Sequence, residues 1–377
     1  MHVSIIANGF QEDYILNLIN NLHSKVDRLD FIGSSIYDGQ KINKQVYFYN
    51  LRGSHNENSS TISKTVRIIR YYIRLLNYLH HSDAEIVHIQ WVRFRILEGI
   101  FFALYTRYFI GKKVIYTAHD VLPHSNDGIY NKILFKIIYS VHNHLIVHTA
   151  YLKDRLIQEF NIKSAKVSVI PHGMYERIEN HLITKTKARE HFKISSNSTV
   201  LLFFGIIAEY KGLDILLKSL NTINDKKTFQ ILVAGRVSPE YKTKFEKLIK
   251  DNDCTNHVFF LRYIKDEEVE MCFKASDVTV LPYKEASQSG VLFMSYAYGI
   301  PVIAPNLGGF KHDIVPGKTG YLFQPNDHLS LADTLVKFKT EWDGTDKAND
   351  YIKNFASVNY SWDNSCKQIA ELYSTVY

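Results

Sequence analysis

The first residues in this sequence with recognisable chemistry lie in a loop of its second half. Gly205 ends an apolar run, and Lys211 and Gly212 stand directly before a segment with helical spacing. A glycine lets a ligand approach the backbone, the amides at a helix start bind phosphate, and a lysine adds a full charge. The loop therefore predicts a diphosphate site, although a plain strand-to-helix turn with a solvent-facing lysine fits it equally well. It contains neither GxGxxG nor a P-loop, which disfavours a dinucleotide or NTPase site.

A second loop with similar chemistry runs from Leu281 to Val291, after an apolar run at 278–281 and before an apolar helix. Ser289, Gly290 and Val291 lie at the start of that helix, where hydroxyl and amide donors can reach an anionic oxygen. Neighbouring parallel strands end at the same edge of a sheet. We therefore expect the two loops to converge on one ligand.

Short apolar runs alternate with longer helical segments twice along the chain, which is the pattern of a parallel sheet with crossover helices. In the first half, the predicted strands are 2–7, 86–90, 114–116, 145–148 and 167–170, with weaker candidates near residues 31 and 46. In the second half, they are 200–205, 229–234, 258–260, 278–281, 302–304 and 321–323. The predicted fold class is therefore α/β with two doubly wound domains, and the cleft between them is the expected ligand site.

A polar, charged stretch without a strand signal separates the two patterns. It predicts an N-terminal domain at 1–175, a linker region at 176–197 and a C-terminal domain at 198–355. Residues 356–377 are predicted to contain a last helix whose apolar contacts are Trp362, Ile369, Leu372 and Tyr373.

The composition describes a packed protein, with 377 residues of which 46% are hydrophobic and 22% charged. Three widely spaced cysteines without a CxxC pair suggest neither a disulfide framework nor a thiolate zinc site, and they fit a reducing compartment. The apolar stretch 96–118 is interrupted by four charged residues, so no transmembrane helix is predicted. The first residues predict a strand rather than a signal peptide. Together these features predict a cytoplasmic protein.

Charge is uneven along the chain. Residues 1–175 contain 20 Lys and Arg against 13 Asp and Glu, and the remainder holds 25 of each, so the first half carries the whole excess of +7. Arg67, Arg70 and Arg74 lie along one helical stripe beside Tyr and Ile, which favours an anionic membrane surface. A solvated basic face on a core helix explains the stripe at least as well. A nucleic-acid partner is disfavoured because no recognised nucleic-acid motif accompanies the charge.

In the order of its motifs, the second half resembles the C-terminal domain of family 4 retaining glycosyltransferases, which have the two-domain GT-B fold. The similar segments are 203–205, 211–212, 233–236, 275–278, 281–283, 297–304, 308–309 and 317–320. The first half resembles the family more loosely, through Gly9-Phe10, 116–120 and 169–173. The segment 360–362 is also similar to the family's closing helix, which returns to the N-terminal domain.

The resemblance implies transfer of a sugar from a UDP-sugar or GDP-sugar, with retention of anomeric configuration and without an essential metal or other cofactor. It implies that Lys211 and Arg236 stabilise the leaving diphosphate, with Lys211 acting in catalysis as well as binding. The implied donor-binding set is Gly205, Lys211, Arg236, Glu285, Ser289, Gly290 and Val291. His119 is the implied catalytic residue near the transferred sugar, where it would bond a hydroxyl or relay a proton. The implied acceptor-side cleft residues are Gly9, Phe10, Asp120 and His172.

This sequence departs from the family pattern at the donor site. Many members carry two glutamates eight positions apart, and the corresponding positions here are Ala286 and Met294. Glu285 lies one place early, and whether it replaces the first glutamate stays open. The run Gln288-Ser289-Gly290-Val291 is similar to a variant loop that defines a subgroup of the family.

The residues leave no support for a metal centre. His142, His144 and His148 share one face of a predicted strand, but they lack an acidic partner. Polar groups at a sheet edge are therefore the preferred interpretation, and no metal site is predicted.

The predicted function is that of a hexosyltransferase acting on a glycan acceptor, with a lipid-linked glycan of bacterial surface polysaccharide synthesis as the favoured case. Because such an acceptor lies in the membrane, peripheral attachment of the protein to the inner face of the plasma membrane is also predicted. Two alternatives stay open, a non-catalytic sugar-nucleotide-binding GT-B module and a GT-B nucleotide-sugar epimerase. The missing glutamates support the first alternative and argue against a hydrolysing epimerase.

Overall fold

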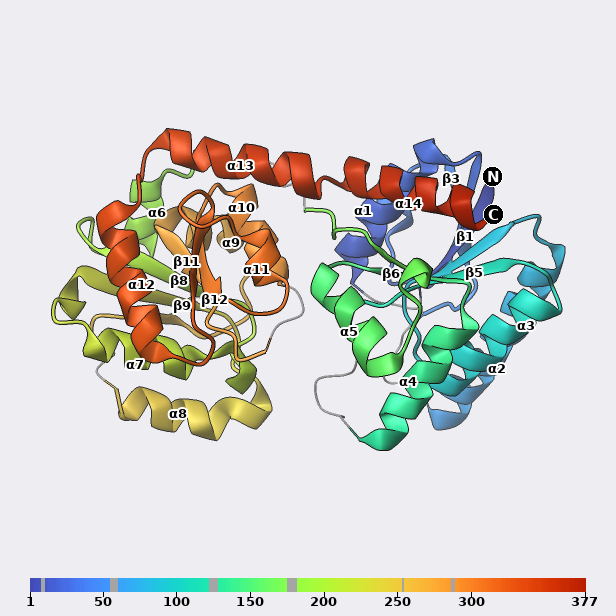
Figure 1. The fold of residues 1–377 in the computed structure, drawn as a ribbon, viewed down its shortest axis with the longest axis horizontal. Helices are drawn as coiled ribbons and strands as arrows, with labels where there is room; N and C mark the ends of the chain where they lie inside the picture. Colours follow the sequence, from blue (N-terminus) through green and yellow to red (C-terminus); the bar gives the residue numbers. More distant parts are fainter. Residues whose placement is uncertain (8–10, 55–59, 122–127, 175–181, 253, 286–288) are drawn as a thin grey trace. The chain divides into compact units, whose positions relative to one another are not determined.

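The computed structural model describes residues 1–7, 11–54, 60–121, 128–174, 182–252, 254–285 and 289–377. The chain divides into two compact units. The first comprises Met1–Gly173 together with Asn359–Tyr377, and the second comprises Met174–Val358. Each unit is built around its own parallel sheet (Figure 1).

The sheet of the first unit has seven parallel strands in the order β3-β2-β1-β4-β5-β6-β7. Its strands are β1 (His2–Ile6), β2 (Arg28–Gly33), β3 (Val46–Asn50), β4 (Ile86–Ile89), β5 (Lys113–Thr117), β6 (His144–Val147) and β7 (Val167–Val169). All strands predicted for this half are confirmed, including the two weaker candidates, which are β2 and β3. The strand order reverses beside β1, which pairs with both β2 and β4.

Helices cover both faces of this sheet. One face packs against α1 (Glu12–Leu22) and α14 (Trp362–Val376). The other face packs against α2 (Thr61–His81), α3 (Ala103–Tyr108), α4 (Ile129–Val141) and α5 (Ala150–Phe160). Short turns of helix are η1 (His23–Lys25), η2 (Gly39–Lys41), η3 (Leu97–Phe102) and η4 (Ser164–Lys166). The four predicted apolar contacts of the last helix are all buried in α14.

The sheet of the second unit has six parallel strands in the order β10-β9-β8-β11-β12-β13. Its strands are β8 (Thr199–Phe204), β9 (Phe229–Ala234), β10 (Val258–Phe260), β11 (Val278–Val280), β12 (Val302–Pro305) and β13 (Gly320–Phe323). Every strand predicted for this half is confirmed. The order reverses between β8 and β11, so both units are doubly wound α/β domains, as predicted.

The second sheet is likewise covered on both faces. One apolar cluster joins it to α7 (Leu213–Thr222), α8 (Lys242–Lys250) and α12 (His328–Glu341). A second cluster joins it to α6 (Lys185–His191), α9 (Asp266–Ala275) and α10 (Gly290–Ala297). The remaining elements are α11 (Phe310–Asp313), α13 (Asp346–Tyr360), η5 (Glu209–Lys211), η6 (Lys226–Thr228) and η7 (Pro239–Tyr241).

Two helices differ from the predicted domain plan. Helix α6 lies inside the stretch predicted as a linker, and Arg189 on it pairs with Asp277 at 2.7 Å. This ion pair and the packing of Ala188 and Phe192 make the stretch part of the second unit. Helix α13 crosses the predicted boundary at 355 and passes from the second unit to the first.

None of the described helices combines the length and the apolar character that crossing a bilayer requires.

Candidate functional site

The two loops with phosphate-binding chemistry follow neighbouring strands. Strand β8 pairs with β11, and the loops leave their carboxyl ends. The amide of Lys284 donates to the carbonyl of Tyr210 at 2.8 Å, which ties one loop to the other. Gly212 has φ +72°, and a Cβ there would lie 1.8 Å from the carbonyl oxygen of Pro282. Only glycine allows the loops this contact. The two loops therefore meet as predicted, whereas their binding of one shared ligand stays a prediction.

A chain of hydrogen bonds joins the lysine of the first loop to the helix start of the second. Lys211 Nζ donates to Tyr283 Oη at 2.5 Å and lies 3.8 Å from the centre of that ring. Tyr283 Oη lies 3.1 Å from Ser289 Oγ, and both side chains are buried. Ser289 precedes α10, whose first amides lack acceptors within the helix. This series of hydrogen bonds therefore links the Lys211 ammonium to the N-terminus of α10.

The charge of Lys211 is only partly solvated. Burial lowers the pKa of its ammonium to about 8. No carboxylate in the described ranges forms an ion pair with it, whereas Lys284 of the second loop pairs with Asp214 at 3.0 Å. Lys211 thus presents a positive charge that a bound anion can neutralise.

Glycines keep the ends of these strands free of side chains. Gly205 has φ +98°, and a Cβ there would lie 3.7 Å from Val291. A Cβ on Gly235 would lie 1.8 Å from the carbonyl oxygen of Gly205. At Gly290, a Cβ would meet nothing within 4 Å among the described residues. A ligand can therefore approach the backbone of both loops.

The other predicted donor residues lie less centrally. Arg236 is exposed after β9, and its carbonyl accepts from the amide of Ile207 at 2.9 Å. Glu285 is exposed. Ala286 and Gln288 lie outside the described residues. Met294, at the position of the family's second glutamate, packs against the apolar cluster below α10, where a carboxylate would be costly.

In the first unit, three histidines lie beyond the carboxyl ends of neighbouring strands. His119 follows β5, His148 follows β6 and His172 follows β7. The ring centres of His119 and His148 are 5.0 Å apart, and those of His148 and His172 are 5.6 Å apart. His148 Nε2 lies 3.2 Å from His119 Nδ1, and His148 Nδ1 lies 3.0 Å from the carbonyl oxygen of Ile170. The histidines form one cluster, joined by a hydrogen bond and by ring contacts.

These imidazoles are neutral at pH 7. Burial lowers the pKa of His148 to about 4 and that of His172 to about 3. Burial and the neighbouring histidines also hold the pKa of His119 well below its usual value. A neutral imidazole can bond a hydroxyl or take up a proton. His119 is half-buried, and its role near a transferred sugar stays a prediction.

The predicted acceptor-side residues are placed unequally. Gly9 and Phe10 lie outside the described residues, and Asp120 is half-buried beside His119. His172 is buried, and its ring centre lies 4.8 Å from that of Tyr14 and 5.5 Å from that of Trp362. His172 therefore packs against Tyr14 and Trp362, and its acceptor-side role stays a prediction.

His142, His144 and His148, which share one face of a predicted strand in the sequence, have separate partners in the structure. His142 Nδ1 bonds the carbonyl of Ile138 at 2.6 Å, and His144 Nε2 bonds Ser168 at 2.9 Å. In the ranges that the structure describes, no group of three His, Cys, Asp or Glu could hold a metal ion. These hydrogen bonds are those of structural groups, but the predicted place at a sheet edge is wrong, because His142 caps the end of α4 and His144 lies on β6, an inner strand.

Tyr283 had no role of its own among the residues predicted from the sequence. The feature of the sequence that could have indicated a role for Tyr283 is its place shortly after a buried strand, in the loop that faces Lys211.

Helix α2 contains the basic stripe as predicted, with Arg70 and Arg74 exposed and Arg67 half-buried.

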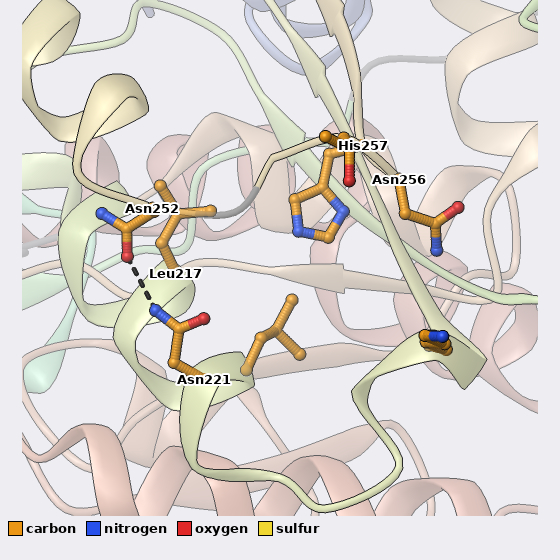
Figure 2. Close-up of a pocket in the computed structure, with 8 residues that line it drawn as sticks. Leu217, Asn221, Asn252, Asn256 and His257 are labelled. Atoms are coloured by element: carbon orange, nitrogen blue, oxygen red, sulfur yellow. Dashed lines mark hydrogen bonds between the residues drawn. The ribbon is translucent and has the colours of Figure 1, made fainter.

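A pocket of about 400 Å³ lies at the opposite edge of the second sheet, where β9 and β10 begin. Figure 2 shows its lining, in which Asn221 donates to Asn252 at 2.8 Å beside Leu217, Asn256 and His257. Open α/β sheets bind ligands at the carboxyl ends of their strands. We therefore place the candidate site at the Lys211 loops.

Comparison with known families matches both halves of the chain. Residues 11–175 match the family model described as Glycosyltransferase Family 4. Residues 184–357 match the model described as Glycosyl transferases group 1. The two matches meet close to the junction of the two units.

Individual proteins show the same likeness. A D-inositol 3-phosphate glycosyltransferase of Corynebacterium urealyticum is 28% identical over 240 residues, which span 62% of this chain and 56% of that relative. HepE of Anabaena, solved in complex with UDP and glucose, is 15% identical with a TM-score of 0.74, and all of both chains is covered. WaaG, a glycosyltransferase involved in lipopolysaccharide biosynthesis, is 16% identical with a TM-score of 0.66, covering 98% of this chain and 99% of WaaG.

Proposed function

This chain belongs to glycosyltransferase family 4, of the GT-B fold, and from that premise we propose that it transfers a hexose from a UDP-sugar or GDP-sugar with retention. The observation that carries the proposal is the half-buried Lys211 ammonium, held at the contact of two carboxyl-edge loops without a carboxylate partner among the described residues. The complex of HepE with UDP and glucose supports a nucleotide sugar as donor.

The chemistry follows from the charges. The bond between the anomeric carbon and the diphosphate oxygen breaks, and negative charge develops on the leaving nucleoside diphosphate. Lys211 and the first amides of α10 would stabilise that charge, with Arg236 as a further cation and no essential metal. His119 would bond a hydroxyl of the sugar or accept the proton of the attacking acceptor hydroxyl.

The proposed acceptor is a lipid-linked glycan of bacterial surface polysaccharide synthesis. The lipopolysaccharide role stated for WaaG supports this acceptor class. Arg67, Arg70 and Arg74 on α2 support a peripheral position at the inner face of the plasma membrane.

One observation favours a second candidate, a sugar-nucleotide-binding module without turnover. Met294 fills the place of a donor-site glutamate and packs into apolar surroundings. Incubation with a panel of radiolabelled nucleotide sugars separates the two functions. Slow hydrolysis of one donor supports the enzyme, and tight binding of a donor without turnover supports the module.

Thermal unfolding with UDP, GDP and ADP tests the donor site. The preferred nucleotide should raise Tm, because a ligand at about 100 times its Kd adds about 2.7 kcal/mol to the free energy of unfolding. Lys211→Met should abolish the shift, whereas Lys284→Met, a matched change at a lysine that Asp214 already neutralises, should keep it. Equal shifts in both variants would place the nucleotide elsewhere.

Donor binding should weaken as pH rises through 8. The pKa of Lys211 is about 8 in the free protein, and a diphosphate stabilises the ammonium, so binding takes up a proton. The Kd of a UDP-sugar should be flat below pH 7 and rise roughly tenfold per pH unit above 8. Calorimetry between pH 7 and 9.5 measures this slope. Lys211→Arg, whose guanidinium stays charged, should flatten it, and an unchanged slope in that variant would assign the titration to another group.

A further inference from the structure

Four neighbouring elements, α2, η3, α3 and α4, form one layer over the first sheet. Tyr72 on α2 donates to Glu98 of η3 at 2.7 Å, and a Cβ on Gly99 would lie 3.0 Å from Ile138 on α4. Helices α2, α3 and α4 pack on the same face of the sheet through one apolar cluster (Figure 1). The outward surface of α2, η3, α3 and α4 is called the helix face below.

Helix α2 is apolar on both of its sides. Tyr71, Leu75 and Leu79 are buried against the sheet. A second stripe, Ile62, Val66, Ile69 and Ile73, has a spacing of four, three and four residues and is 77%, 48%, 54% and 63% exposed. At 100° per residue this stripe points away from the buried one. A surface helix of a water-soluble domain places polar residues there.

The apolar exposure continues beyond α2. Phe101 at the end of η3 is 62% exposed, and Phe109, directly after α3, is 79% exposed. On α4, Ile129 and Ile133 are 78% and 56% exposed. More than half of the exposed large apolar side chains of the described chain lie between residues 62 and 137. Concentrated exposure of this kind marks an interaction surface.

The charge of the helix face has one sign. Helix α2 contains Arg67, Arg70 and Arg74 beside its exposed apolar stripe and has no acidic residue. Helices α3 and α4 have none either. The acidic residue of η3, Glu98, is buried and bonded to Tyr72. The face therefore offers apolar side chains and positive charge together.

We infer that the helix face docks on an anionic lipid bilayer, with its Ile and Phe side chains at the acyl boundary and its arginines at the headgroups. A nucleic acid would match the charge but leave the aliphatic stripe in water, whereas an anionic bilayer satisfies both. The inference extends the proposed function, which places the acceptor at such a surface. It predicts binding by the full chain without any donor or acceptor.

Cosedimentation with vesicles tests it. The full chain should bind phosphatidylglycerol-containing vesicles, should bind pure phosphatidylcholine vesicles far more weakly, and should lose affinity as salt rises. Each arginine near an anionic surface contributes roughly fivefold in affinity. The triple change Arg67→Glu, Arg70→Glu and Arg74→Glu should therefore weaken binding by about a hundredfold or more. Ile69→Ser with Ile73→Ser, at exposed positions, should weaken it even at low salt.

A matched control comes from α8 in the second unit. Lys242→Glu, Lys247→Glu and Lys250→Glu change the net charge equally, and these side chains lie on a helix far along the chain from the helix face. This variant should keep nearly all vesicle binding. If the α2 and α8 variants lose vesicle binding equally, binding depends on net charge alone and the inference is wrong. Unchanged binding in the α2 variant would also overturn the inference. The absence of vesicle binding by the wild-type chain would overturn it too, as would binding to an acidic protein in place of vesicles.

Nucleotide binding, measured on the same variants by thermal shift, separates this inference from the proposed function. Vesicle binding without any nucleotide response would support membrane docking by the helix face and contradict the proposed donor site. A nucleotide response without vesicle binding would support the donor site and contradict membrane docking.

Discussion

Replacing Lys211 with methionine should lower the rate of sugar transfer, or of donor hydrolysis, by roughly two to three orders of magnitude. A single preorganised donor at the developing charge lowers the barrier by about 3 kcal/mol. Methionine keeps most of the side-chain volume but cannot donate a hydrogen bond. The loss should appear in kcat/KM, because Lys211 contacts the diphosphate of the bound donor as well as the negative charge that grows on it as the bond breaks. Steady-state kinetics with the preferred donor measures it.

Two further variants decide how the loss is interpreted. Lys284→Met removes a lysine from the adjoining loop, but that lysine is paired with Asp214, so its kcat/KM should stay within severalfold of wild type. Tyr283→Phe keeps the ring beside Lys211 and removes the hydroxyl that links Lys211 to Ser289. It should cost less than Lys211→Met, with Tyr296→Phe, another buried tyrosine of this unit, as its control. If Lys211→Met retains wild-type kcat/KM, the assignment of the leaving-group site is wrong.

The fold could be predicted because buried parallel strands are nearly uniform apolar runs. β6 and β9, buried along their whole length, show this signal clearly. Strand β3 lies at the edge of its sheet and exposes Tyr47 and Asn50, so its apolar signal was weak. Helix α6 was missed because its sequence is mostly charged, and only Ala188 and Arg189 are buried in it.

The site could be predicted in outline because the order of strands determines which loops meet. The contact of Lys211 with Tyr283 could not, since it depends on side-chain conformations and burial that only the packed loops create. From the sequence, His148 was grouped with His142 and His144, its neighbours in the chain. In the fold its partners are His119 and His172, which follow the adjacent strands β5 and β7. Partners across a parallel sheet are distant in sequence, and spacing alone does not reveal them.

Replacing Trp362 with alanine should lower the free energy of unfolding of the first unit by about 3 to 5 kcal/mol, the usual cost of removing a buried tryptophan. Trp362 is 2% exposed, and its ring centre lies 5.1 Å from that of Tyr14 on α1. A Cβ on Gly173 would lie 2.1 Å from the Trp362 ring, so the indole fills the space that this glycine leaves. Its removal opens a cavity between α1 and α14 and loosens α14 from the sheet.

Chemical denaturation should resolve this effect by unit, because the two units are separate compact bodies and need not unfold in one transition. In Trp362→Ala, only the transition that does not respond to nucleotide should move. The matched control is Trp342→Ala. Trp342 is a half-buried tryptophan of the second unit that stacks on Phe338 with ring centres 5.7 Å apart, and its loss should shift the other transition by less.

Trp362→Phe should destabilise the first unit less than Trp362→Ala, because it keeps an aromatic ring and removes an indole Nε1 that is buried without a partner among the described residues. A loss below about 1 kcal/mol in Trp362→Ala would mean that α14 contributes little to the first unit, and the packing of that helix would then have to rest on Ile369 and Tyr373.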